Sequence, residues 1–160
     1  MTNAYRSPYW DSSVWIALVA GEVVGGVNRA EIAQHILEDA EQGKVTILTS
    51  AFTLAEVLKK KGRPVLAVAA EETIRSYFEH SFIRIVVLDR VIGELAASVA
   101  RQHNLSPPDA IHVASALTWK ADVLHTWDDG LVKKSGQIGN PPLRIEHPGW
   151  TGQQPLPLPT

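Results

Sequence analysis

The sequence predicts an α/β fold: a three-layer α/β/α sandwich around a central, mostly parallel sheet of four to five strands. Short runs of β-branched and aliphatic residues alternate along the chain with longer stretches whose apolar residues recur at three- and four-residue spacing. That alternation is typical of strand–helix–strand units, whose strands pair in parallel. At 160 residues, with 45% hydrophobic and 20% charged residues, the chain has the size and composition of one globular domain with a packed core.

The expected strands are short. The clearest ones cover residues 45–49, 82–88 and 123–126, and an edge strand is expected around 143–146. A further strand should end at Trp10. Because Pro8 cannot donate a hydrogen bond to a sheet, it must stand at the first residue of that strand or outside it.

The expected helices are longer and amphipathic. They cover residues 13–20, 28–42, 53–61, 64–79, 90–103 and 107–119, each with apolar residues at helical spacing. Residues 1–147 are expected to form the domain. Residues 148–160 carry four of the ten prolines and predict an extended or disordered tail.

Composition narrows the classes of function. The absence of cysteine excludes disulfide frameworks, thiol nucleophiles and zinc ribbons. No secretory hydrophobic region follows Met1 and no apolar run reaches the roughly 18 residues of a membrane span, so a soluble, cytoplasmic protein is expected. The net charge of −2 does not by itself indicate a nucleic-acid partner. The basic run at 59–61 with Arg63 is interpreted as a solvent-facing helix end rather than as a phosphate contact.

Four acidic residues follow expected strands or open the helices that come next: Asp11, Glu56, Asp109 and Asp128. Open α/β sheets bind their ligands beyond the carboxyl ends of the strands. The four carboxylates are therefore expected at one end of the sheet.

Each acid taken alone has a simpler explanation. Asp and Glu are common in the first turn of a helix, where they cap free N–H groups and complement the helix dipole. Ser106 and the two prolines before Asp109 form a capping-box-like helix start. Asp89 also follows a strand, and it is interpreted only as the N-cap of the next helix.

The four acids together indicate a metal site. Several carboxylates in one crevice repel one another and have raised pKa values unless a cation neutralises them. The candidates offer only oxygen ligands, which suit Mg²⁺ or Mn²⁺ rather than zinc. Two such ions about 4 Å apart can activate a water molecule and stabilise the leaving oxygen in phosphodiester hydrolysis.

The four acids lie in four segments between residues 9 and 131: WDSSVWIAL (10–18), TSAFTLAEV (49–57), PDAIHVASAL (108–117) and LHTWDDGL (124–131). These segments resemble those of the PIN-domain family and, within it, of VapC-like toxins. The third segment is the most specific, and the order and spacing of all four make the resemblance strong.

The resemblance implies a Rossmann-like α/β/α fold, RNA cleavage that depends on Mg²⁺ or Mn²⁺, frequent homodimers, and an antitoxin partner that also binds DNA. It further implies that Asp11, Glu56, Asp109 and Asp128 are the metal ligands or water-activating groups, with Ser13 or Thr126 hydrogen-bonded to them. Because Asp129 adjoins Asp128, the sequence leaves open which of the two reaches the metal.

One histidine and two tryptophans lie close to these acids in the sequence. His112 is interpreted as a buried packing residue rather than as a catalytic one, and Trp10 and Trp127 either stack an RNA base or pack in the crevice wall. The main interpretation is the toxin ribonuclease of a type II toxin–antitoxin pair. The alternatives are an RNA-processing PIN nuclease without an antitoxin, and an inactive PIN module that only binds, which the presence of all four acids argues against. An aspartyl-phosphate phosphatase is disfavoured because Ser13 stands where its second aspartate is required.

Overall fold

The computed structural model describes residues 5–58 and 62–149, and its centre is a five-stranded parallel sheet. The strand order is β5-β4-β1-β6-β7, and every neighbouring pair is parallel. The strands are β1 (Pro8–Trp10), β4 (Ile47–Ser50), β5 (Ile83–Val86), β6 (Val123–His125) and β7 (Ile145–Glu146). The predicted α/β fold and parallel sheet are confirmed, and Pro8 stands at the first residue of its strand as expected.

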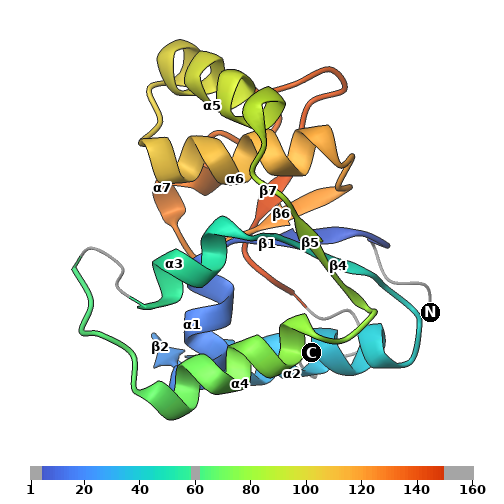
Figure 1. Cartoon of the computed structure of the whole chain (residues 1–160), viewed down its shortest axis with the longest axis vertical. Helices are drawn as coiled ribbons and strands as arrows, with labels where there is room; N and C mark the ends of the chain where they lie inside the picture. The colour runs from blue at the N-terminus through green and yellow to red at the C-terminus, as the bar shows by residue number, and fades with distance from the viewer. Residues whose placement is uncertain (1–4, 59–61, 150–160) are drawn as a thin grey trace, which may run out of the picture.

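Helices cover both faces of the sheet (Figure 1). The helices α5 and α6 lie on one face, and α1, α2 and α4 lie on the other. The bounds are α1 (Ser12–Ala20), α2 (Arg29–Glu41), α3 (Phe52–Leu58), α4 (Val68–Phe78), α5 (Arg90–His103), α6 (Pro107–Thr118) and α7 (Asp129–Val132). Within the described ranges, no helix is long and apolar enough to cross a membrane.

Alternation along the strands divides the apolar residues between two cores. Trp10, Ile47 and Val123 pack in the core beneath α1 and α2. Their strand neighbours Tyr9, Leu48 and Leu124 pack in the core beneath α5 and α6. Because consecutive side chains in a strand point to opposite faces, both faces of these strands are buried, as in other parallel sheets.

Several boundaries differ from the sequence prediction for physical reasons. The helix expected at 64–79 begins only at Val68. The residues before it are not helical, and Leu66 among them packs against the first core. The strand expected at 82–88 ends at Val86, where its partner β4 also ends with the pair Ser50 and Val86. Residues 59–61, the predicted end of the helix at 53–61, lie outside the described residues.

Two small elements were not predicted. The strands β2 (Val23–Val24) and β3 (Val27–Asn28) form an antiparallel hairpin whose turn residues Gly25 and Gly26 both have positive φ. A pair of glycines between two valine-containing runs is a known hairpin signal, but the sequence analysis assigned no element to residues 21–27, between two expected helices. The other element is α7, a single turn after β6.

The end of the described chain remains packed against the domain. Pro148 is buried, and the carbonyl of Gly149 accepts a hydrogen bond from the Tyr5 hydroxyl at 2.8 Å. The predicted tail at 148–160 therefore begins with packed residues, and its part from residue 150 onward lies outside the described residues.

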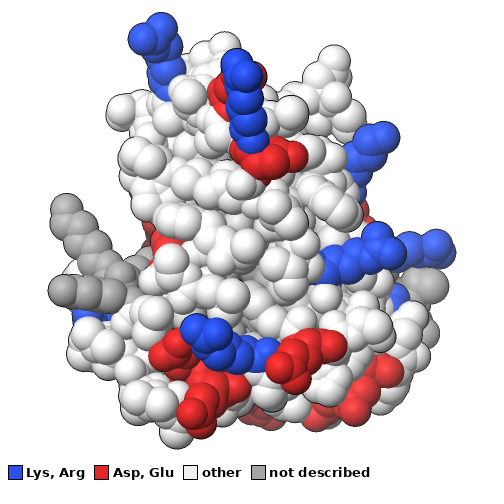
Figure 2. All heavy atoms as spheres, in the orientation of Figure 1, with Lys and Arg blue, Asp and Glu red and all other residues white. Residues whose placement is uncertain are grey.

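Charged side chains on the helical surface form local pairs. Figure 2 shows basic and acidic side chains interspersed over α4 and α5, where Arg75 pairs with Glu71 and Arg90 pairs with Glu94. Both pairs have i, i+4 spacing, and such exposed pairs contribute little to stability.

The buried histidine of β6 makes the fold sensitive to acid. Burial, with a smaller contribution from the charge of Arg144, lowers the pKa of His125 from 6.5 to about 3. Below about pH 6.5 the unfolded chain binds a proton at this residue and the folded chain does not. The free energy of unfolding should therefore fall as pH decreases from about 6.5 toward 5, by up to about 1.4 kcal/mol per pH unit.

Urea unfolding of the wild type and of His125→Leu at a series of pH values checks this prediction. The variant should lose this part of the pH dependence whatever its stability near neutral pH. Identical pH slopes for the two proteins would show that His125 does not stay neutral in the fold.

Candidate functional site

Asp11 is the buried carboxylate at the end of the central strand. It directly follows β1, is 3% exposed, and forms the N-cap of α1. Its Oδ1 accepts hydrogen bonds from the Ser13 backbone N at 3.0 Å and from the Ser13 hydroxyl at 2.5 Å. Capping thus offsets part of the cost of burying this carboxylate and fixes its direction.

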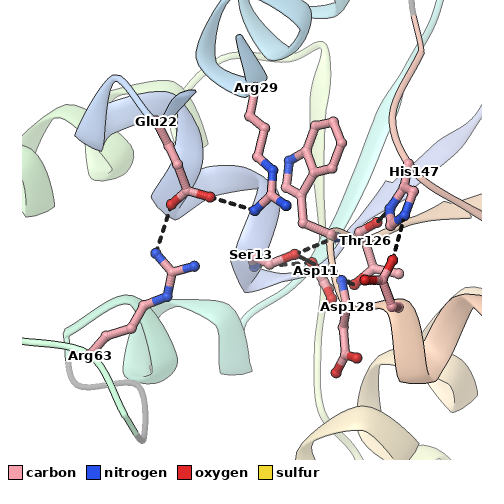
Figure 3. Close-up of polar contacts among 10 residues, drawn as sticks. Asp11, Ser13, Glu22, Arg29, Arg63, Thr126, Asp128 and His147 are labelled. Atoms are coloured by element: carbon pink, nitrogen blue, oxygen red, sulfur yellow. Dashed lines mark hydrogen bonds and ion pairs between the residues drawn. The ribbon is translucent and has the colours of Figure 1, made fainter. Parts of the chain in front are cut away.

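Ser13 and Thr126 join the end of β1 to the end of β6 (Figure 3). The Ser13 hydroxyl accepts from the Trp127 backbone N at 2.9 Å, and it lies 3.5 Å from the Thr126 hydroxyl. Thr126 in turn accepts from the Asp128 backbone N at 3.0 Å. The predicted hydrogen bond from Ser13 to Asp11 is present, whereas Thr126 contacts the backbone of Asp128 and not its carboxylate.

Asp128 is exposed and forms the N-cap of α7. Its Oδ1 accepts from the Gly130 backbone N at 2.8 Å. Its neighbour Asp129 turns to His147, whose Nε2 lies 2.8 Å from the Asp129 carboxylate. The structure therefore separates the two adjacent acids: Asp128 lies beside Thr126, and Asp129 contacts His147.

Asp109 lies in the first turn of α6 and is half-buried. Ser106 is the N-cap of this helix, as predicted, and its hydroxyl accepts from the Asp109 backbone N at 3.4 Å. Burial raises the pKa of Asp109, and the negative charges of Asp128 and Asp11 raise it further. Asp11 and Asp128, from two other segments of the chain, thus both lie within electrostatic range of Asp109.

Glu56 stands apart from these three acids in its contacts. It lies on α3, the helix that follows β4, and its carboxylate bonds to Nε2 of His112. His112 is 1% exposed, and its Nδ1 lies 2.7 Å from the hydroxyl of Tyr9. The neutral Nε2–H tautomer satisfies both contacts, because Tyr9 then donates to Nδ1 while His112 donates to Glu56.

His112 is therefore buried and hydrogen-bonded, as the sequence analysis interpreted it. Its partner, however, is one of the four candidate acids, and the sequence did not indicate that pairing. His112 also lies one turn from Asp109 on α6, close enough that a positive charge on its ring would lower the pKa of Asp109. His112 consequently links Glu56 to the acidic cluster, which we define as Asp11, Asp109 and Asp128.

The two tryptophans near the site are packing residues. Trp10 is fully buried and packs edge-on against Trp15, with ring centroids 4.8 Å apart, so it is not available to an RNA base. Trp127 is half-buried between other groups: the Arg29 guanidinium lies 4.7 Å from its ring, and the His147 ring stacks on it at 5.4 Å.

Comparison with known protein families shows which family the chain is similar to. The model of the PIN domain matches residues 9–136, which contain all four candidate acids. The chain belongs to the PIN-domain family. PIN domains are typically nucleases, and they generally use a divalent metal ion.

Solved structures similar to this PIN domain include VapC toxins. A toxin–antitoxin complex from Klebsiella pneumoniae matches with a TM-score of 0.60 and 20% identity over 89% of this chain and 98% of that one. VapC20 of Mycobacterium tuberculosis, a Sarcin-Ricin loop cleaving toxin, matches with a TM-score of 0.57 and 18% identity. The match covers 78% of this chain and 92% of that one. VapBC2 of Rickettsia felis, bound to a DNA fragment from its promoter, matches with a TM-score of 0.57 and 19% identity. The match covers 88% of this chain and 98% of that one. At these identities the likeness shows a shared fold, and no curated protein matches the sequence significantly.

The chemistry of the acidic cluster fits a divalent ion. In the part of the chain that the structure describes, no group of three or more acidic or histidine side chains is arranged closely enough to hold an ion as it stands. The cluster nevertheless offers only carboxylate oxygens, which hard ions such as Mg²⁺ and Mn²⁺ prefer. The pKa of Asp109 is raised by burial and by repulsion from the other acids, and a bound cation would offset both effects.

Ser13 should be important for the stability of this PIN domain. Ser13→Ala removes the acceptor of the Trp127 N–H and a donor to the buried Asp11 carboxylate, so the free energy of unfolding should fall by about 1–3 kcal/mol. Urea unfolding measures this, with Thr73→Ala on the exposed face of α4 as the control, for which a loss below about 0.5 kcal/mol is expected. Equal small losses in both variants would show that the Ser13 hydrogen bonds do not stabilise the site.

Proposed function

We propose that this PIN domain is an endoribonuclease that hydrolyses RNA phosphodiester bonds with Mg²⁺ or Mn²⁺, and that it is the toxin of a type II toxin–antitoxin pair. The observation that carries the proposal is the convergence of the acidic cluster. Asp11 and Asp128 follow the neighbouring strands β1 and β6, and the charges of both act on Asp109 at the start of α6.

In this proposal the acidic cluster holds the metal. Asp11, Asp109 and Asp128 would supply carboxylate oxygens, and Ser13 holds Asp11 in a fixed orientation. A divalent ion, when bound, supplies positive charge to the phosphodiester group and to a water molecule beside it.

Glu56 has a different role from the three acids of the cluster. His112 and Tyr9 form a buried chain of hydrogen bonds that orients the Glu56 carboxylate. A carboxylate held in this way, half-buried and bonded to a histidine one turn from Asp109, is suited to accept a proton from the attacking water. We therefore assign Glu56 to proton transfer or to metal binding through its second oxygen.

The partner proposal rests on the solved relatives. The Klebsiella structure is a toxin–antitoxin complex, and the Rickettsia structure contains the VapBC2 pair on promoter DNA. By analogy we propose a cognate antitoxin for this chain, and from the resemblance to the PIN-domain toxins we propose a homodimer. An RNA-processing PIN nuclease without an antitoxin is the alternative, and it shares the same chemistry.

Substitutions of the four acids test the proposed chemistry. Asp11→Asn, Glu56→Gln, Asp109→Asn and Asp128→Asn should each reduce the rate of metal-dependent cleavage of a labelled single-stranded RNA by roughly 100-fold or more. The control is Asp89→Ala, because Asp89 also follows a strand but caps α5, accepting from the Ile92 backbone N. It should cleave at nearly the wild-type rate.

Two outcomes would contradict the proposal. A wild-type protein that does not cleave RNA at any Mg²⁺ or Mn²⁺ concentration would indicate a binding module. An equal loss in Asp89→Ala and in the four acid variants would show that the position after a strand, rather than the acidic cluster, explains the losses.

A further inference from the structure

Two arginines share the carboxylate of Glu22, and one of them lies near the acidic cluster. Arg29 Nη1 lies 2.6 Å from one carboxylate oxygen of Glu22, and Arg63 Nη1 lies 2.8 Å from the other. Figure 3 shows the two arginines on either side of Glu22, with Arg29 on the side of Ser13 and Asp11. We call Glu22, Arg29 and Arg63 the arginine clamp.

The clamp has one more positive charge than it needs to neutralise Glu22, since two guanidinium groups share one carboxylate. Burial alone would raise the pKa of Glu22, but the hydrogen bonds and charges of Arg63 and Arg29 outweigh it and lower that pKa. Glu22 therefore stays ionised, and the clamp keeps a net charge of about +1 at neutral pH.

Arg29 is the member of the clamp that lies next to the cluster. Its guanidinium covers the Trp127 ring at 4.7 Å, and the backbone N of Trp127 donates to Ser13, which bonds to Asp11. The hairpin β2–β3 produces this arrangement, because it brings Glu22 back to the start of α2, where the carbonyl of Glu22 accepts from the Arg29 backbone N at 2.9 Å.

The position of Arg29 is unfavourable for the helix alone. It is the first residue of α2, where the helix dipole disfavours a cation. Its side chain is only 19% exposed and is fixed by Glu22 and Trp127, so its rotamer freedom is already restricted. A preorganised guanidinium loses little further entropy when it binds a ligand.

Arg29 also retains hydrogen-bonding capacity. Only Nη1 of its guanidinium is bonded to a described residue, so the N–H groups of Nε and Nη2 are available. Their planar geometry matches two oxygens of a phosphate group. An RNA strand with one phosphate at the acidic cluster carries further phosphates along the same backbone, whereas an acidic peptide has no such fixed repeat.

We propose that Arg29 is a positioning residue that binds a backbone phosphate of the RNA next to the one held at the acidic cluster. The inference rests on the proposed ribonuclease function and adds to it a contact that does not read the base sequence. Glu22 and Trp127 hold Arg29 in place, and Arg63 keeps Glu22 neutralised when Arg29 engages the RNA.

Equilibrium RNA binding tests this contact without cleavage. The full chain is titrated against a fluorescently labelled single-stranded RNA with Ca²⁺ in place of Mg²⁺ or Mn²⁺, over a series of salt concentrations, and the RNA is checked on a gel to be intact. Arg29→Gln should bind roughly tenfold more weakly than the wild type at low salt. Its plot of log affinity against log salt should be shallower by about 0.7, the value for the loss of one phosphate contact on a single strand.

Two further variants separate the phosphate contact from a structural effect. Arg29→Lys keeps the charge and should keep the wild-type salt slope with an intermediate affinity, which also covers the case in which Arg29→Gln folds poorly. The matched control is Arg75→Gln, which removes an arginine from another Arg–Glu pair, on α4, and should bind as the wild type does.

The outcomes distinguish this inference from the proposed function. Wild-type affinity and salt slope in Arg29→Gln would overturn the inference, and metal-dependent cleavage by the wild type would then still support the nuclease. The same salt slope with weaker binding in both Arg29 variants would show a structural role and would also overturn it. A wild type that neither binds nor cleaves RNA would overturn the proposed function itself.

Discussion

Asp11, Asp109 and Asp128 repel one another at the carboxyl edge of the sheet, and the fold holds them there through local hydrogen bonds. Asp11 and Asp128 each cap a helix, and Asp109 lies in the first turn of a third helix. Helix N-termini stabilise negative charge, so each acid is tolerated individually. Burial, and after it the charges of Asp128 and Asp11, still raise the pKa of Asp109. In the proposed function a bound cation would offset this remaining repulsion.

The surroundings of the cluster are polar on both sides, and the two sides differ in charge. On the side of α3 and α6, the buried His112 fixes Glu56. On the side of α2, Arg29 and Arg63 share Glu22 and leave excess positive charge. The proposed RNA substrate suits this arrangement, because a cation at the cluster would hold one phosphate and Arg29 would bind the next.

The fold and the positions of the four acids were largely predictable from the sequence, because they depend on local patterns. Apolar runs marked β4, β5 and β6, and capping residues such as Asp89 and Ser106 marked the starts of helices. What distinguishes Asp128 from Asp89 is strand order: β6 adjoins the central strand β1, whereas β5 is at the sheet edge. The resemblance to PIN domains singled out Asp128 by its motif, whereas the strand order was not predicted from the sequence.

The polar pairings between distant segments were not predictable. Glu56 and His112 are 56 residues apart, and their contact depends on how α3 and α6 approach each other. Glu22 meets Arg29 only because the overlooked hairpin β2–β3 reverses the chain between them. The helical and strand periodicity of the sequence indicates neither pairing.

The most direct test of the central claim is the effect of Mn²⁺ on thermal unfolding of the wild type and of Asp109→Asn. If the acidic cluster is a repulsive cation site, Asp109→Asn should melt at a higher temperature than the wild type without metal, because it removes one of three repelling charges. Saturating Mn²⁺ should raise the melting temperature of the wild type and have little effect on the variant. A wild type whose melting temperature does not respond to Mn²⁺, or a variant that responds equally, would contradict this account of the site.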